Sequence, residues 1–557
     1  MLNDGDDDPV RIVSTAVLGN STRAVAATLQ PTTELYECMH SLIHAGASIQ
    51  IVGSTLYGDG KVTANGDAVL FGGASLHADL SAAGSISGIG SVTGATKVLD
   101  ESLPMPDPTD VIGLYSAEGT AINLNSLTLP SPPVITKNGD FNAGETHWFA
   151  RVSGQLSSSN HGHTDASSVK TASRTSSQSG PAQDVTGRLV KGGQLNAECW
   201  VTHNAPDSGA GAGVGVEGAT FLAEDSYAIF IEAVTTSGTS SQIQLTPWQS
   251  TNGSWVHLSG NLKCDWQGTL QKATCYVRSK NLNLTIWVDD FLVSEDTSGF
   301  ELIHRVVFSP NNNPFGSTTN PKGIYVINCG NKSVALDRVR LHGTLVLTNV
   351  AHCTVRGAPC HFQSAVDGYP IIVADGGLTI ESTDDGLAES LAEANFNPAN
   401  APFAGMSDSD SDDTYRSILD GIVYSSGSIQ IGHESPLTGP VLANQSVTIN
   451  NATLGQFRTR RYDQESNLPG FTKRAFVLGQ NSIHETLPIL PSSTSSQGGG
   501  DVPTGPVDPS DPTSIDPAIP PDPIGTDPVP SGPATDPPNN GQSFEKANPL
   551  DPVNFGI

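Results

Sequence analysis

Positively charged residues are scarce in this chain of 557 residues. Lys and Arg number 27 against 56 Asp and Glu, which gives a formal net charge of −29 at pH 7. Proteins that bind nucleic acids neutralise backbone phosphates with Lys and Arg, so this balance argues against a nucleic-acid partner. The excess of carboxylates instead favours a neutral ligand or a cation.

Long apolar runs are also missing. The sequence has no window of about 18 apolar residues, so it predicts no transmembrane segment. The N-terminal run Met1–Asp8 is acidic, whereas a signal peptide is basic and then apolar. Either the chain is cytosolic or its true N-terminus, with an export signal, lies upstream of Met1, and we expect the second.

Cysteine spacing of the metal-binding type is absent too. The seven cysteines include no CxxC pair and no Cys/His spacing typical of zinc sites, so a zinc-stapled fold is not expected. Cys264 and Cys275 flank a short turn-like stretch. They would either face each other across a hairpin or be ordinary buried thiols.

Composition favours β-structure. Charged residues make up 15% of the chain, while Gly, Ser, Thr and Asn are abundant. Long surface helices need Glu, Lys, Arg and Ala, so this composition favours turns and strands. At roughly 100–200 residues per domain, the length indicates three or four units. We predict an all-β protein of several domains.

The chain opens with two apolar segments around a turn signal. Residues 10–18 and 22–29 are typical of β-strands on either side of Gly19-Asn20, so we expect a β-hairpin in residues 1–32. This hairpin resembles the one that follows the membrane anchor in minor pilins of the PilX type. The resemblance implies an anchor helix upstream of Met1 and other pilus subunits as partners.

Two stretches, 33–133 and 298–490, consist of short strand-like segments separated by glycines, such as Ser48–Val52 and Gly323–Ile327. Short strands at this spacing, with small residues at the corners, are typical of a parallel β-solenoid. An irregular sandwich is the alternative. We expect the second stretch to continue the coils of the first, with residues 134–297 inserted between coils.

The flanking segments carry a second resemblance. Met105-Pro106-Asp107, Asn311–Gly316 and Gly323–Ile327 are similar to segments of uncharacterised pilus-associated proteins from planctomycete-type bacteria, a family without assigned chemistry. Residues 491–557 are built on Asp-Pro dipeptides with almost no apolar run. Such segments bury too little surface to offset their ordering entropy, so we expect a disordered tail.

All six tryptophans lie between residues 134 and 297. Short alternating segments in the same range predict a β-sandwich. Four segments resemble, in order and spacing, a CenC-type carbohydrate-binding module of families 4, 9 and 22, and the resemblance implies a jelly-roll sandwich that binds polysaccharide. These segments are Asn138–Gly144, Leu195–Val201, Trp255–Gly260 and Trp287–Val293.

Alternation along the strands identifies candidate ligand contacts. Side chains two residues apart share a face of a strand, which places Asn196, Glu198 and Trp200 together on a polar face and Trp287 and Gln244 on the polar faces of their own strands. A tryptophan ring that faces solvent can stack on the apolar face of a pyranose ring. We predict that the two tryptophans stack on sugar while the other three residues bind hydroxyls. Packing of the rings under a loop or edge strand is the alternative.

The resemblance also implies a structural calcium ion, with Asp140 and Asp290 as the matching ligands. Exposed turn carboxylates are the alternative for both. The run Ser407–Asp413 would attract calcium as well, but it lacks the glycine and the distal Glu of an EF-hand loop, so we expect a solvated loop. We expect the same of His161-Gly162-His163.

Motifs of common enzymes are absent: the sequence has no G-x-S-x-G, H-E-x-x-H or phosphate loop. A glycosidase needs two carboxylates about 5–10 Å apart, and no motif pairs two of the many carboxylates here. We predict non-catalytic glycan binding by an extracellular, surface or pilus-associated protein. The alternatives are a structural pilus or envelope component and a polysaccharide-active hydrolase or lyase that carries a binding module.

Overall fold

The computed structural model describes residues 9–18, 21–127, 129, 131–203, 226–251, 253–280, 284–383, 385–432, 436–450, 453–457 and 468–486. The chain divides into two compact units, 1–488 and 489–557. The second unit, and with it the predicted tail, lies outside the described residues.

The described residues are almost entirely β-structure, which confirms the all-β prediction. None of their helices is long and apolar enough to span a membrane. The helical elements are α1 (Pro108–Glu118), α2 (Glu389–Ala392) and the 3-10 turns η1 (Glu37–His40), η2 (Leu124–Ser126) and η3 (Thr186–Arg188).

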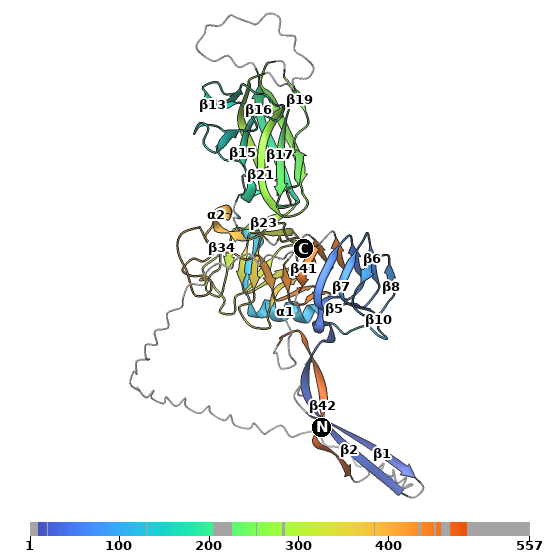
Figure 1. The fold of residues 1–557 in the computed structure, drawn as a ribbon. Helices are drawn as coiled ribbons and strands as arrows, with labels where there is room; N and C mark the ends of the chain where they lie inside the picture. Colours follow the sequence, from blue (N-terminus) through green and yellow to red (C-terminus); the bar gives the residue numbers. More distant parts are fainter. Residues whose placement is uncertain are drawn as a thin grey trace, which may run out of the picture. The chain divides into compact units, whose positions relative to one another are not determined.

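Both ends of the first unit share one antiparallel sheet of three strands, ordered β1-β2-β42. Its strands are β1 (Val10–Leu18), β2 (Ser21–Leu35) and β42 (Thr472–Thr486). Leu18 pairs with Ser21 in the N-terminal hairpin, and Ala24 pairs with Thr486. The two ends of this unit therefore run side by side (Figure 1).

Most other strands outside residues 134–297 form three parallel sheets, because successive coils of the chain each add a strand to two or three of them. Sheet 1 contains β11 (Thr120–Asn123), β25 (Ile324–Asn328), β28 (Thr344–Thr348), β31 (Pro370–Ala374), β36 (Ile422–Ser425), β39 (Val441–Ala443), β3 (Ser41–Ala45), β5 (Thr55–Ala64), β7 (Ser75–Ala82) and β10 (Thr96–Val98), in this spatial order. Its remaining strands are β41 (Thr453–Phe457), paired with β5, and β9 (Ser91–Val92), paired with β7.

The other two parallel sheets follow the same path. Sheet 2 contains β23 (Glu301–His304), β26 (Ser333–Asp337), β29 (His352–Val355), β32 (Gly377–Ile380), β37 (Ile429–Gly432), β40 (Val447–Asn450), β4 (Ile49–Val52), β6 (Ala68–Phe71) and β8 (Ile86–Gly88). Sheet 3 contains β24 (Val307–Phe308), β27 (Arg340–His342), β30 (His361–Gln363), β35 (Ile418–Asp420) and β38 (Leu437–Thr438).

Stacked apolar side chains hold the coils together. In sheet 2, one residue of each coil lies directly under its equivalent in the next, and every member is at most 2% exposed. One such column is Val334, Cys353, Leu378, Ile429, Val447, Ile49 and Ala68. Burying a side chain of this size contributes about 1.5–3 kcal/mol, so the column is a main source of coil stability.

The order of the coils differs from the expected continuation. β39 pairs with β3 and β40 pairs with β4, so the coils of residues 301–450 come before those of residues 41–98 in the stack. One coil is completed by both ends of the unit, with β40 and β41 from one end and β3 from the other. Every coil offers the same unpaired backbone edge to a neighbour, so strand periodicity does not encode which coil comes next.

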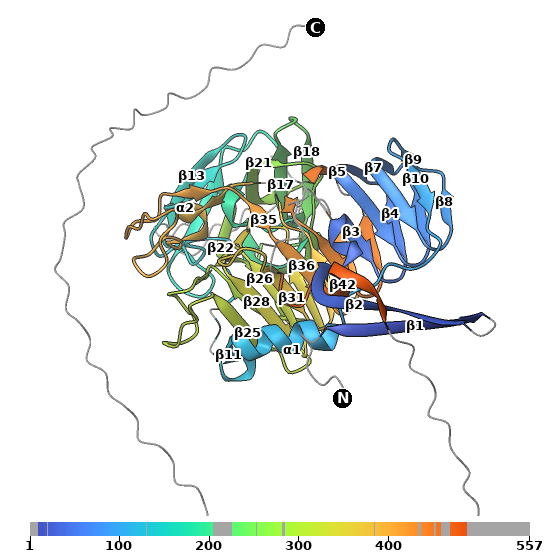
Figure 2. The same cartoon turned by 90° about the horizontal axis from the view of Figure 1, so that it is seen from below.

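Helix α1 carries the chain from β10 back to the start of the stack. The carboxylate of Asp107 accepts a hydrogen bond from the Thr109 N–H at 2.8 Å and caps the helix. Val111 and Tyr115 are buried against residues of sheet 1, and Figure 2 shows α1 beside β25 and β31. Residues 134–297 therefore leave from the end of the stack, between β11 and β23, rather than between two neighbouring inner coils.

Residues 134–297 form two antiparallel sheets packed face to face (Figure 1). The β16 sheet contains β13 (Gln155–Ser159), β14 (Ser168–Ala172), β22 (Ile286–Glu295), β16 (Gly193–Thr202) and β20 (Val256–Cys264). The β17 sheet contains β12 (Trp148–Ala150), β15 (Pro181–Asp184), β21 (Leu270–Ser279), β17 (Ser226–Thr235), β18 (Ser240–Gln244) and β19 (Gln249–Ser250). Cys264 and Cys275 are free buried thiols on different sheets, so they do not pair across a hairpin.

Candidate functional site

Four of the five predicted sugar contacts lie on the outer face of the β16 sheet. Asn196 and Glu198 are exposed there and border a hollow of ≈ 550 Å³. Trp287 faces outward as the alternation predicts, but it is only 7% exposed. Its indole N–H has no hydrogen-bond partner among the residues that the structure describes. The ring of Trp287 therefore offers little surface to a sugar.

Trp200 lies on the same face and is covered by imidazoles. His163 stacks on its ring with centroids 3.6 Å apart, and His257 lies at 4.8 Å. The backbone N–H of His163 donates to the buried carboxylate of Asp289 at 2.6 Å, which fixes the loop to the sheet. His163 thus stacks on Trp200 while it remains exposed in its loop. The stack leaves less of the Trp200 indole surface open to a pyranose.

The outer face of the β17 sheet carries a second set of aromatic rings. Phe230 and Tyr276 are neighbours across β17 and β21, with centroids 5.9 Å apart, and Trp248 lies 5.6 Å from Phe230. We refer to these three residues as the aromatic face. Gln244 pairs with Phe230, so the fifth predicted contact lies here, apart from the other four.

Charged and amide side chains surround the aromatic face. The guanidinium carbon of Arg151 lies 4.0 Å from the centroid of the Tyr276 ring, and Arg151 pairs with Glu232 at 2.8 Å. Arg278 lies over Phe230 at 5.4 Å and donates to Gln242 at 3.3 Å. Rings flanked by guanidinium and carboxylate groups combine stacking surface with hydrogen-bonding groups.

Two polar atoms of this face are buried without a hydrogen-bond partner in the described part of the chain: the hydroxyl of Tyr276 and Nε of Arg278. Burial raises the pKa of Tyr276 above its usual value, so its phenol stays protonated and can donate. Unsatisfied buried polar groups are rare and cost about 1–3 kcal/mol each.

The predicted calcium ligands lie at one edge of the sandwich. The N–H of Phe291 donates to the carbonyl of Gly139 at 2.8 Å, which brings the segments of Asp140 and Asp290 together. A Cβ on Gly139 would lie 1.9 Å from the Phe291 oxygen, so only glycine fits. Asp140 accepts hydrogen bonds from Asn142, and Asp290 accepts one from the Thr164 hydroxyl.

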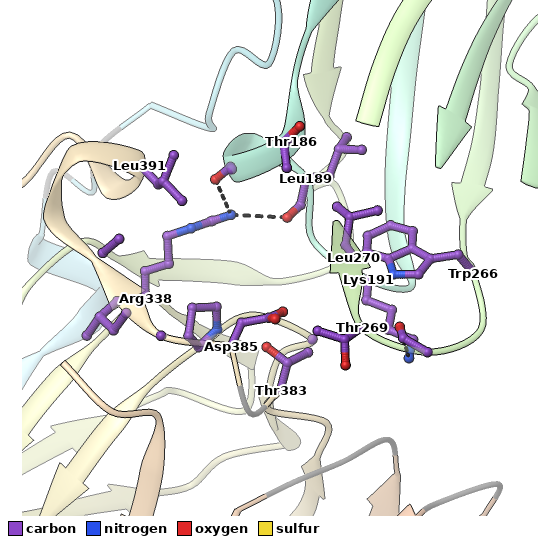
Figure 3. A pocket seen from close by; sticks show the side chains of 17 residues that line it. Thr186, Leu189, Lys191, Trp266, Thr269, Leu270, Arg338, Thr383, Asp385 and Leu391 are labelled. Atoms are coloured by element: carbon purple, nitrogen blue, oxygen red, sulfur yellow. Dashed lines mark hydrogen bonds between the residues drawn. The ribbon is translucent and has the colours of Figure 1, made fainter. Parts of the chain in front are cut away.

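A cavity of ≈ 260 Å³ lies where the sandwich meets the coils. Trp266 and Leu270 line it from the sandwich, and Leu391 lines it from α2 (Figure 3). Arg338 donates from the coils to two sandwich carbonyls, while both oxygens of the buried Asp337 accept from it at 2.9 Å. The cavity is smaller than common ligand sites of about 300–1,000 Å³. The contacts around this cavity hold the sandwich and the coils together, and we refer to them as the joint.

Residues 134–283 match the model of a family described as a carbohydrate binding domain. The sandwich is a carbohydrate-binding module. This confirms the family resemblance that the sequence motifs indicated for this part of the chain. The match includes all three residues of the aromatic face, Phe230, Trp248 and Tyr276.

Two curated relatives match part of the chain. Endo-1,4-beta-xylanase A of Thermoanaerobacterium saccharolyticum is 25% identical over 203 residues, which are 35% of this chain and 15% of that protein. Exoglucanase XynX of Acetivibrio thermocellus is 24% identical over 163 residues, which are 29% and 14% of the two chains. The chain thus spans about one seventh of the length of these relatives.

Solved structures similar to the module include two xylan-binding domains. The CBM22-1 xylan-binding domain of Xyn10C from Paenibacillus barcinonensis is 18% identical, with a TM-score of 0.24, and the match covers 30% of this chain and 97% of that domain. The CBM22-2 domain of the same protein is also 18% identical, with a TM-score of 0.24, over 28% of this chain and 98% of that domain.

Proposed function

We propose that the module binds polysaccharide through the aromatic face of the β17 sheet. The observation that carries this proposal is the half-buried Trp248 ring, which has Arg278 at 5.8 Å and Lys280 at 4.9 Å from its centroid. Trp248 is half-buried and offers the accessible ring, while Phe230 and Tyr276 form the floor beside it. A sugar would stack on Trp248 and exchange hydrogen bonds with the polar groups around it.

A β-1,4-linked glycan of the xylan class is the ligand that we favour. The support comes from the names of the relatives, one a xylanase and one an exoglucanase. Binding without catalysis is the activity that we propose for the chain. Asp337, one of several carboxylates in the second coil stretch, is held in an ion pair with Arg338 at the joint.

Calorimetry of the full chain with soluble xylan and with β-glucan oligosaccharides tests the proposed face. We expect Trp248→Ala and Arg278→Ala each to weaken xylan binding at least about tenfold, because each removes a contact worth about 1–2 kcal/mol. Trp200→Ala on the other sheet is the matched control and should change affinity less than about twofold. A loss confined to Trp200→Ala would move the site to the β16 sheet, and absence of binding by the wild type would reject the proposal.

Structural calcium at the edge of the module is a further part of the proposal. Asp140 and Asp290 flank the backbone pairing of Gly139 with Phe291, and no Lys or Arg in the described residues pairs with either carboxylate. Calcium prefers several oxygen ligands of this kind. Asp140→Asn and Asp290→Asn should then lower the melting temperature of the module in calcium but not in chelator.

We also infer an extracellular location, because a polymer of the xylan class lies outside the cell that binds it. The resemblance of the N-terminal hairpin to minor pilins supports pilus subunits as further partners. Fractionation of the native cells tests both statements, since a pilus partner predicts co-purification with sheared filaments.

A further inference from the structure

An excursion of residues 385–417 leaves the coils between β32 and β35. Its strands β33 (Leu387–Ala388) and β34 (Thr414–Tyr415) pair with each other, and α2 follows β33. Arg340 of β27 donates to the carbonyls of Phe396, Ala401 and Pro402 and anchors the excursion to the coils. The acidic run Ser407–Asp413 lies in this excursion as a loop whose residues 407–412 are exposed, as its sequence predicts.

Three carboxylates of the excursion converge. Glu389, Asp408 and Asp413 each offer one oxygen, and these oxygens lie within 4.8 Å of one another. Glu389 is fully buried, and its Oε1 accepts hydrogen bonds from the Phe396 N–H and the Tyr415 hydroxyl. In the described part of the chain, no Lys, Arg or His forms an ion pair with any of the three. Arg340 interacts electrostatically with Glu389, but its guanidinium donates to backbone carbonyls, so the three carboxylates meet without a direct ion pair in the described residues.

A buried amide marks the same spot independently. Asn397 is 3% exposed, and its amide nitrogen donates to Asp408 at 3.1 Å and to Asp413 at 2.9 Å. Its Oδ1 is buried without a hydrogen-bond partner among the described residues. A rotation of the amide by 180° exchanges its nitrogen and oxygen. The oxygen would then face two carboxylates, an arrangement that is favourable only with a cation between them.

We propose that Glu389, Asp408, Asp413 and Asn397 bind one calcium ion. Calcium–oxygen distances of about 2.3–2.6 Å allow one ion to contact three oxygens that lie within 4.8 Å of one another. Calcium accepts several carboxylate and amide oxygens in flexible geometry, whereas magnesium usually keeps several waters and zinc prefers nitrogen and sulfur. The acidic run alone lacks a distal Glu, and Glu389 supplies that carboxylate from a position before the run.

The site ties the excursion to the carbohydrate-binding module. Leu391 in the same short helix as Glu389 lines the cavity at the joint, and Glu393 pairs with Lys137 of the module and with Arg305 of the coils. Calcium that fixes α2 would therefore also fix one wall of the joint. We expect chelation to speed proteolytic cleavage within residues 385–417.

Terbium luminescence and calcium calorimetry on the full chain test the proposal. All measurements use a background variant that carries Asp140→Asn and Asp290→Asn. Calcium binding at the edge of the module then does not contribute to the signal from the excursion. In this background, Glu389→Gln with Asp413→Asn should weaken calcium binding at least about thirtyfold, because it removes two of three charged ligands. The matched control, Asp410→Asn with Asp412→Asn, removes two charges from the same run but no ligand, and should change affinity less than about threefold.

Two further variants separate ligand loss from misfolding. Asp408→Asn changes an exposed ligand and should weaken binding at least about tenfold with the melting temperature in chelator unchanged. Tyr415→Phe should abolish most sensitised terbium emission, because the Tyr415 hydroxyl lies 3.0 Å from Glu389. Equal losses in the ligand and control pairs, or full binding by Asp408→Asn, would overturn the proposal and leave only diffuse attraction by the acidic run.

Discussion

At the scale of single residues, His44 shows how burial sets a protonation state. Its imidazole is fully buried in β3, with Nδ1 2.7 Å from the Thr63 hydroxyl. Burial, with a smaller contribution from the charge of Lys61, lowers the pKa of His44 from 6.5 to about 4. Because the unfolded chain takes up this proton near pH 6.5 and the folded chain only near pH 4, acid favours unfolding between these values.

We predict that protonation of His44 removes about 2–3 kcal/mol of stability between about pH 7.5 and about pH 4.5. His44→Gln should lack this part of the loss, because glutamine does not titrate. Urea unfolding at both pH values, followed by far-UV circular dichroism, measures the coils, whereas tryptophan fluorescence reports the module. Other carboxylates and histidines titrate in both proteins, so an equal loss in the two would contradict the prediction.

The candidate site was predictable in part. Alternation placed Trp200 and Trp287 correctly on the outer face of their sheet, but it carries no information about His163, which packs over Trp200 from another segment. The aromatic face was missed because Phe230 and Tyr276 are buried and sit in apolar strands that are typical of core. The usable signal was again period two, since Tyr276 and Arg278 share the face opposite Cys275.

At the scale of elements, corner glycines let one coil lie on the next. A Cβ on Gly343 would lie 2.1 Å from the backbone oxygen of Gly323 in the neighbouring coil. Gly113 in the middle of α1 is exposed, and a Cβ there would have nothing within 4 Å. Replacement of glycine by alanine should therefore have opposite effects on stability at these two positions.

We predict that Gly343→Ala destabilises the coils by about 3 kcal/mol or more, because backbone must move to make room. Gly113→Ala should stabilise the protein by about 0.5–1 kcal/mol through its helix propensity. The midpoint of urea unfolding, followed by circular dichroism, compares both with wild type. Stability of Gly343→Ala within error of wild type would show that the coils do not approach as closely as the structure has them.

Strand periodicity and corner glycines were sufficient to predict short strands in residues 41–98 and 301–450. They did not predict α1, because its residues Val111 and Tyr115 form only a narrow apolar stripe beside Pro108 and Gly113. The excursion with α2 was also missed, since its packing depends on Arg340 from a distant strand. Elements defined by long-range contacts leave little local pattern.

At the scale of the whole molecule, the two ends of the first unit meet in the middle of the stack. β42 pairs with β2, and the coil of β40 and β41 is completed by β3. The break in the chain thus falls where the coils are continuous in space. A circularly permuted chain, in which the present ends are joined and new ends are opened elsewhere, would make the same contacts. We therefore expect the protein to tolerate circular permutation.

We predict that a permuted chain folds if it begins at residue 299, runs to Thr486, passes through a short loop to Ala24 and ends at residue 297. Thr486 and Ala24 already pair as antiparallel neighbours, so the loop creates a β-hairpin. The loss of β1 removes only an edge strand, and the module keeps one covalent link to the coils.

Its melting temperature should lie within about 4 °C of a linear chain of residues 21–486, because the buried stack is unchanged. A control permutant with the same loop but with its new ends at Asn349 and Val350, inside the coil between β28 and β29, should melt lower. There the new ends fray a strand whose backbone bonds both neighbouring coils. Failure of both permutants, while the linear chain folds, would mean that β42 and β2 do not lie side by side.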